Sequence, residues 1–71
     1  MLSVRIFRAG TNATEVGVES GQTVKDVLRK SGLNKKDSEI IQINGEIKSM
    51  DTKVQDGDVI ILAKNIEGGS I

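Results

Sequence analysis

The C-terminal residues are the part of this sequence whose types and spacing point most directly to chemistry. A glycine pair, Gly68-Gly69, lies just before the last two residues, Ser70-Ile71. Adjacent glycines are seldom ordered, because glycine loses more backbone entropy on folding than any other residue. A strap without side chains can enter a narrow channel in another protein. We therefore predict a flexible C-terminal tail over residues 67–71, with a frayed or engineered terminus as the alternative interpretation.

The rest of the chain lacks the side chains on which most enzymes depend. It contains no His, Cys, Trp or Tyr, so the usual general base, the thiolate nucleophile and the commonest metal ligands are missing. Asp56-Gly57-Asp58 resembles a fragment of a calcium loop but lacks the further oxygen ligands, so a turn is the better interpretation. We expect a protein that is not an enzyme and binds no metal or cofactor itself.

Length and charge narrow the class further. A chain of 71 residues forms one domain near the lower size limit for an adequate core. Its 10 basic and 10 acidic residues balance, and Phe7 is its only aromatic residue, whereas nucleic-acid binding favours a basic excess and stacking side chains. No segment is typical of a membrane span or a signal peptide. We expect a cytoplasmic protein that binds neither nucleic acid nor membrane.

Alternating apolar residues predict strands towards both ends of the chain. Residues 2–7 follow a period of two, as do Val16 and Val18 with their neighbours. The short connection at residues 10–13 makes these two strands antiparallel neighbours. The apolar run over residues 59–64 predicts the last strand.

Between these strands, residues 24–31 are predicted to form the one main helix. Thr23 is a suitable N-cap, and Asp26 stands where the acid of a capping box is found. Gly32 occupies the position of a left-handed C-terminal cap. The polar residues 34–39 are expected to form a solvated connection.

A second hairpin is expected after this connection. Asn44-Gly45 predicts a two-residue turn, in which both central residues take positive φ, between strands at 40–43 and 46–48. Residues 49–54 are expected to form an irregular turn or one turn of tight helix. Asp56-Gly57-Asp58 then forms the last turn.

This order of elements predicts an α+β protein of the β-grasp type. One helix must cover one face of a mixed four- to five-stranded sheet, with the first and last strands as parallel partners at its centre. The predicted domain spans residues 1–66. Its predicted core consists of Val4, Ile6, Val16, Val18, Val24, Val27, Leu28, Ile41, Ile43, Ile60 and Leu62.

Four motifs in order resemble a known family. They are Gly21-Gln22-Thr23-Val24, Ile43-Asn44-Gly45-Glu46, Asp56-Gly57-Asp58-Val59-Ile60 and Gly68-Gly69. Together they resemble the ubiquitin-like β-grasp family and, within it, the bacterial sulfur-carrier proteins of thiamin and molybdopterin synthesis (ThiS/MoaD-like). Each motif alone is weak, but the series is fairly specific, and the resemblance covers essentially the whole chain.

The resemblance implies a small carrier protein rather than an enzyme. In this family an E1-like activating enzyme uses ATP and magnesium to adenylate the C-terminal glycine carboxylate. The carboxylate then becomes a thiocarboxylate for sulfur transfer, or a thioester in protein conjugation. The resemblance therefore implies attachment at Gly69, with Gly68 beside it, and places ATP and magnesium on the adenylating partner.

Ser70-Ile71 departs from the family pattern, because the chain as written has no glycine carboxylate. Three explanations remain open. A tail-processing peptidase removes the two residues, the protein has kept the fold as a non-conjugated adaptor, or the two residues are an engineered remnant. The mature C-terminus distinguishes the carrier from the adaptor.

The last predicted strand suggests where a partner binds. Its residues are apolar on both faces, although only one face can lie under the helix. The family spacing places Val59, Ile61 and Ala63 on the outer face, where Phe7 joins them. We expect these four residues to form a docking surface for the activating enzyme. Mutual cover between Phe7 and Ile61, or self-association, are the alternative interpretations.

Overall fold

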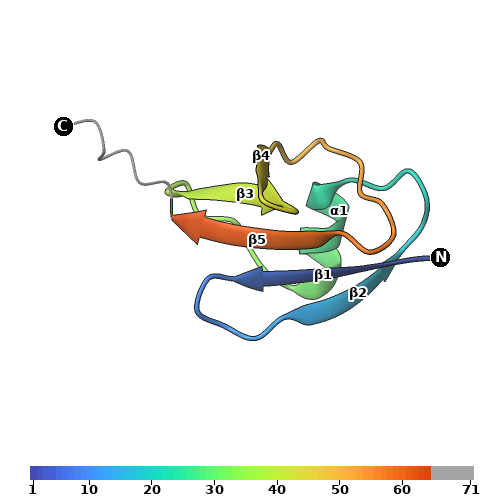
Figure 1. The fold of residues 1–71 in the computed structure, drawn as a ribbon, viewed down its shortest axis with the longest axis horizontal. Helices are drawn as coiled ribbons and strands as arrows, with labels where there is room; N and C mark the ends of the chain where they lie inside the picture. Colours follow the sequence, from blue (N-terminus) through green and yellow to red (C-terminus); the bar gives the residue numbers. More distant parts are fainter. Residues whose placement is uncertain (65–71) are drawn as a thin grey trace.

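The computed structural model describes residues 1–64, and the structural statements below concern this part of the chain. Both the predicted tail over 67–71 and the end of the predicted domain at residue 66 lie outside it. The elements are β1 (Leu2–Arg8), β2 (Thr14–Val18), α1 (Val24–Ser31), β3 (Glu39–Ile43), β4 (Glu46–Lys48) and β5 (Val59–Lys64) (Figure 1).

The five strands form one mixed sheet in the order β2-β1-β5-β3-β4. β1 and β5 are parallel and lie side by side in the middle of the sheet (Figure 1), with Ile6 in register with Ile60. The other neighbouring pairs are antiparallel. This arrangement confirms the predicted β-grasp fold, including the parallel pairing of the first and last strands.

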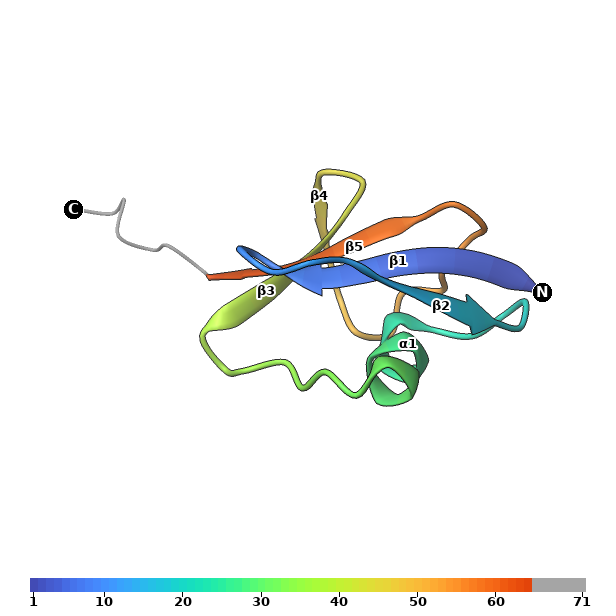
Figure 2. The same cartoon turned by 90° about the horizontal axis from the view of Figure 1, so that it is seen from below.

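The helix α1 lies on one face of the sheet (Figure 2) and packs mainly against β1 and β2. It begins where the sequence predicts, because the Asp26 carboxylate accepts a hydrogen bond of 3.0 Å from the Thr23 backbone N–H. It ends at Gly32, whose φ of 83° is the left-handed conformation that glycine adopts without strain. No helix within residues 1–64 is long and apolar enough to cross a membrane.

All of the predicted core residues are buried, and Val54 joins them as a member that the sequence did not reveal. Val54 lies in the long connection between β4 and β5, which has no periodic pattern. Its backbone N–H donates to the Gln22 carbonyl at 3.0 Å, which holds this connection against the start of α1. Residues 49–54 form an irregular turn and no helix, so the first of the two expected alternatives holds.

The two turn motifs contact one another. Asn44 and Gly45 have φ values of 52° and 90°, as the hairpin requires. The Asn44 amide donates to Asp58 Oδ1 at 3.1 Å, and its oxygen accepts from the Val59 N–H at 3.1 Å. Asp58 also accepts a bond of 2.8 Å from the Gln55 N–H. These side chains therefore hold the start of β5, which supports the interpretation of Asp56-Gly57-Asp58 as a turn.

Candidate docking surface and the end of the last strand

The side chains of β5 alternate between the two faces of the sheet. Ile60 and Leu62 are fully buried on the face of the sheet that α1 covers, as predicted. Val59, Ile61 and Ala63 are half-buried on the opposite, outer face. The structure therefore places these three residues on the face that the sequence indicated.

A row of side chains extends this outer face across four strands. Phe7 is in register with Ile61 on β5, Ile61 with Gln42 on β3, and Gln42 with Ile47 on β4. Ile40 faces outward beside Ala63 in the same way. Ile47 has 67% of its surface exposed, because β4 is a short strand at the edge of the sheet.

We call the apolar residues of this face the outer-face patch, which consists of Phe7, Ile40, Ile47, Val59, Ile61 and Ala63. Phe7 and Ile61 are half-buried and in register on neighbouring strands, which is the arrangement that the alternative of mutual cover requires. No comparable neighbour covers Ile47, and a large exposed aliphatic side chain beside other apolar residues is typical of an interaction surface. Sequence reasoning missed Ile40 and Ile47. The outward position of Ile40 could have been read from the alternation with Ile41 and Ile43.

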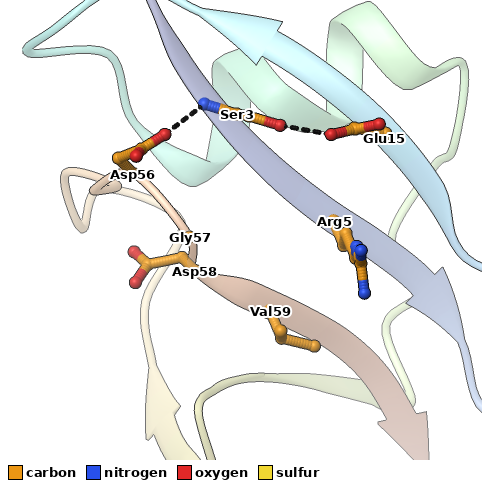
Figure 3. A pocket seen from close by; sticks show the side chains of 7 residues that line it. All are labelled: Ser3, Arg5, Glu15, Asp56, Gly57, Asp58 and Val59. Carbon is orange, nitrogen blue, oxygen red and sulfur yellow. Dashed lines mark hydrogen bonds between the residues drawn. The ribbon is translucent and has the colours of Figure 1, made fainter.

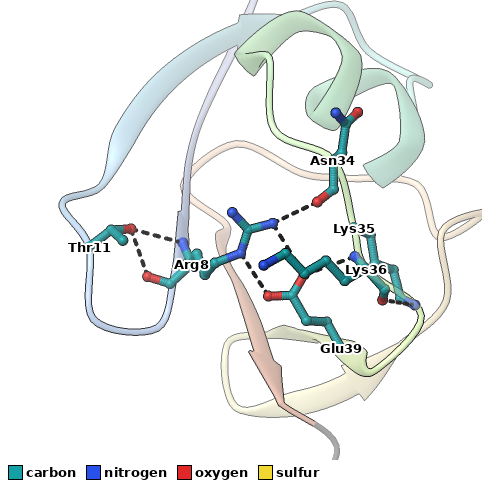
Figure 4. Close-up of polar contacts among 6 residues, drawn as sticks. All are labelled: Arg8, Thr11, Asn34, Lys35, Lys36 and Glu39. Atoms are coloured by element: carbon teal, nitrogen blue, oxygen red, sulfur yellow. Dashed lines mark hydrogen bonds and ion pairs between the residues drawn. The ribbon is translucent and has the colours of Figure 1, made fainter.

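A charged cluster lies on the core face of the sheet, near the residue where β5 ends. Glu39 is the only buried charged residue among residues 1–64, with 6% of its surface exposed. Arg8 Nε donates to Glu39 Oε2 at 2.7 Å, and Arg8 Nη2 donates to Glu39 Oε1 at 3.2 Å (Figure 4). Nη2 also donates to the Asn34 carbonyl at 2.6 Å. The guanidinium therefore joins β1, β3 and the connection that precedes β3.

The expectation that residues 34–39 form a solvated connection was therefore wrong for Glu39. Its carboxylate also accepts a 2.9 Å bond from the Lys36 N–H, and its own N–H donates to the Lys36 carbonyl at 2.9 Å. The hydrogen bonds from Arg8, and then that from Lys36, lower the pKa of Glu39 from 4.5 to about 2 despite its burial. A charge burial of this kind depends on a partner far away in sequence, which a local pattern does not reveal.

The lowered pKa of Glu39 predicts a specific acid sensitivity. The folded protein binds a proton at Glu39 less readily than the unfolded chain, so this carboxylate stabilises the fold above about pH 4.5. That stabilisation should be lost as the pH falls from 4.5 towards 2. Glu39→Gln should be less stable than the parent at pH 7 and should lose less further stability on acidification. Urea unfolding at pH 7, 4.5 and 2.5 measures both effects.

Asp37→Asn is the matched control, because it neutralises an exposed carboxylate in the same connection. It should leave the stability at pH 7 and its decline in acid close to those of the parent. Equal acid dependence for Glu39→Gln and the parent would contradict the assignment of the low pKa to Glu39.

A polar hollow of about 300 Å³ lies at the beginning of β5 (Figure 3). The Ser3 hydroxyl donates to Glu15 Oε2 at 2.6 Å, and the Ser3 N–H donates to Asp56 Oδ1 at 2.8 Å. Among residues 1–64 no group of three or more acidic side chains is placed to hold a metal ion. Ser3 therefore joins β1 to the neighbouring strand and to the turn before β5, and we assign this cluster a structural role.

Within residues 1–64, the parallel central strands, the one helix on the core face and the apolar outer face define a ubiquitin-like β-grasp protein. The fold is similar to the crystal structure of SAMP1 from Haloferax volcanii, with a TM-score of 0.73 and 20% identity over 94% of this chain and 99% of the other. A second structure of the H. volcanii small archaeal modifier protein 1 gives a TM-score of 0.74 and 18% identity over 90% and 98%. Caldiarchaeum subterraneum ubiquitin matches with a TM-score of 0.63 and 23% identity over 96% and 98%.

The sequence matches the ThiS family over residues 4–69, which is nearly the whole chain. The chain belongs to the ThiS family and is a ubiquitin-like carrier protein, as its motifs predicted. The matched segment ends at Gly69, the residue to which the resemblance assigns the attachment. Gly68 and Gly69 themselves lie outside the described residues.

Proposed function

We propose that this protein is a carrier whose Gly69 carboxylate is activated by adenylation, once Ser70-Ile71 has been removed. The activated group serves sulfur transfer as a thiocarboxylate, or protein conjugation as a thioester. The observation that carries the proposal is the family match, which extends through Gly68-Gly69 and stops there. The fold of residues 1–64 supports it, because β5, the strand that precedes Gly69 in the sequence, lies in the middle of the sheet and also carries the apolar side chains of the outer face.

The chemistry assigns separate tasks to the carrier and its partner. Attack of the Gly69 carboxylate on the α-phosphate of ATP forms an acyl-adenylate and releases pyrophosphate. A sulfur nucleophile then attacks the acyl carbon and releases AMP. The chain supplies the carboxylate and a docking surface, while an E1-like adenylating enzyme supplies ATP, magnesium and the catalytic groups. A carrier without His or Cys is compatible with this division, since it performs no acid–base or thiol chemistry itself.

The outer-face patch is the surface that we assign to the adenylating partner. Val59, Ile61 and Ala63 project from β5, the strand that leads towards Gly69. Lys64 ends β5, and the five residues from there to Gly69 span at most about 18 Å when fully extended. A partner bound to the patch must therefore hold its adenylation site within that distance of the end of β5.

Replacing Ile61 by Asp should weaken binding to the adenylating enzyme by about 30-fold or more. A charge at the centre of an apolar contact must be desolvated without a partner, which costs about 2 kcal/mol or more at a typical hot spot. The maximal rate of adenylation should be retained at saturating carrier, because the partner holds the catalytic groups. Titration calorimetry and the KM for the carrier measure the two effects.

Ile47→Asp extends this test to a residue that is already 67% exposed on a short edge strand, so the substitution should not unfold the protein. Ala13→Asp adds the same charge to the exposed loop between β1 and β2 and should leave binding unchanged. If both isoleucine variants bind as tightly as Ala13→Asp, the outer-face patch is not the docking surface.

The second candidate function is a non-conjugated adaptor that binds its partner through the same patch. The observation that favours it is Ser70-Ile71, which leaves Gly69 without a free carboxylate in the chain as written. An adaptor should bind its partner equally well whether the chain ends at Gly69 or at Ile71, with no requirement for ATP. A carrier should require the shorter form for activation.

A further inference from the structure

The ion pair between Arg8 and Glu39 crosses β5 on the core face of the sheet. β1 and β3 are the two neighbours of β5. Arg8 follows buried Ile6 by two positions and is in register with Leu62, whereas Glu39 precedes buried Ile41 by two positions and is in register with Lys64. The two side chains therefore come from opposite sides of β5 and meet beneath its last residues.

The end of β5 is held less completely than the rest of the strand. Its register with β1 stops at Leu62, whose carbonyl accepts a final bond of 2.9 Å from the Ala9 N–H. Ala63 and Lys64 continue to pair with β3 alone, through Ile40 and Glu39. Strand ends with pairing on one side open more readily than strands paired on both sides. The position of Lys64 therefore depends on what fixes the start of β3.

Arg8 and Lys36 supply that fixation. The planar guanidinium binds both carboxylate oxygens of Glu39 and the Asn34 carbonyl, so it joins three separate segments in one geometry. The Lys36 N–H adds a further bond to the carboxylate. A pair of apolar side chains could fill the same space. It would not fix the relative orientation of the joined segments as a bidentate charged contact does.

We propose that Arg8 and Glu39 are positioning residues for the activation of Gly69. They fix the position of Lys64, the last residue of β5, relative to the outer-face patch. The inference rests on the proposed carrier function. Once the patch is docked, a fixed Lys64 sets the distance that the chain must cover for the Gly69 carboxylate to reach the partner's ATP. Loss of such positioning lowers the rate of the chemical step rather than the affinity.

The test compares chains that all end at Gly69 and carry the parent sequence, Arg8→Lys or Glu39→Gln. Arg8→Lys keeps the charge but loses the planar fork, and Glu39→Gln keeps the shape but loses the charge. Amide hydrogen exchange from Ile61 to Lys64 reports how firmly the strand end is held. ATP–pyrophosphate exchange with the host's adenylating enzyme gives kcat and the KM for the carrier.

We expect faster amide exchange at the end of β5 in both variants, a kcat lower by about tenfold, and an unchanged KM. Val16→Ala is the stability control, because it truncates a buried residue of β2, a strand that does not neighbour β5. It should lower the unfolding temperature without changing kcat. A loss of kcat in Val16→Ala equal to that in the ion-pair variants would reduce their effect to general destabilisation and overturn the inference.

Two further outcomes separate this inference from the proposed function. If the parent chain ending at Gly69 is adenylated and both ion-pair variants match its kcat, or change KM alone, the positioning role is wrong and the carrier function stands. If the parent chain ending at Gly69 is not adenylated at all, the carrier function fails, and the positioning role fails with it.

Discussion

A chain that ends at Gly69 should form an acyl-adenylate with ATP and the adenylating enzyme of its host, whereas the chain that ends at Ile71 should not. Adenylation requires a free carboxylate on the residue that enters the partner's channel. In the longer chain the Gly69 carbonyl is part of an amide bond to Ser70, and the free carboxylate belongs to a β-branched isoleucine. ATP–pyrophosphate exchange and the mass of the adenylate measure the difference, which should approach all or none.

Gly69→Ala in the shortened chain tests why glycine is needed. A methyl group at this position must fit a channel that otherwise receives no side chain, so activation should fall strongly. The unfolding temperature should stay close to that of the parent, because the core consists of residues between Val4 and Leu62. Equal adenylation of the forms ending at Gly69 and Ile71 would contradict the assignment of the chemistry to Gly69.

Leu28→Ala should destabilise the fold by about 2–5 kcal/mol. Leu28 has 4% of its surface exposed and belongs to the buried face of α1, with Val24 and Val27. The truncation removes apolar contacts and leaves a cavity between the helix and the sheet. A domain of this size has a total stability at the low end of about 5–15 kcal/mol, so the variant should be close to unfolding. Urea unfolding followed by circular dichroism measures the loss.

Arg29→Ala is the matched control for this prediction. Arg29 is the next residue of the same helix but is exposed, and its contact with Asp26 is a long ion pair of 3.8 Å. Alanine is a good helix former, so the stability should change by less than about 0.5 kcal/mol. Similar unfolding midpoints for Leu28→Ala and Arg29→Ala would mean that the helix face has been assigned wrongly.

Much of the fold could be predicted because the local signals agree with the tertiary arrangement. The alternation in β1 and β5, the capped helix from Val24 to Ser31 and the Asn44-Gly45 turn each specify one structure through short-range chemistry. The Arg8–Glu39 pair could not be predicted in this way. Its members are 31 residues apart, and the charge of Glu39 suggested solvent exposure. Val54 escaped prediction because no periodic element surrounds it.

The candidate site divides along the same line. The outward positions of Val59, Ile61 and Ala63 follow from a period of two once Ile60 and Leu62 face the core. The contribution of Ile47 follows only from the register between β3 and β4, which places it in one row with Gln42 and Ile61. The attachment at Gly69 comes from the family motif and not from the geometry of residues 1–64.

Intact-mass analysis of the protein from its native host tests the carrier function most directly. We predict a species that ends at Gly69, with a fraction in which sulfur replaces one carboxylate oxygen or in which Gly69 is joined to another protein. A native protein that retains Ser70-Ile71 in every molecule would contradict the carrier function and leave the adaptor as the function of this fold.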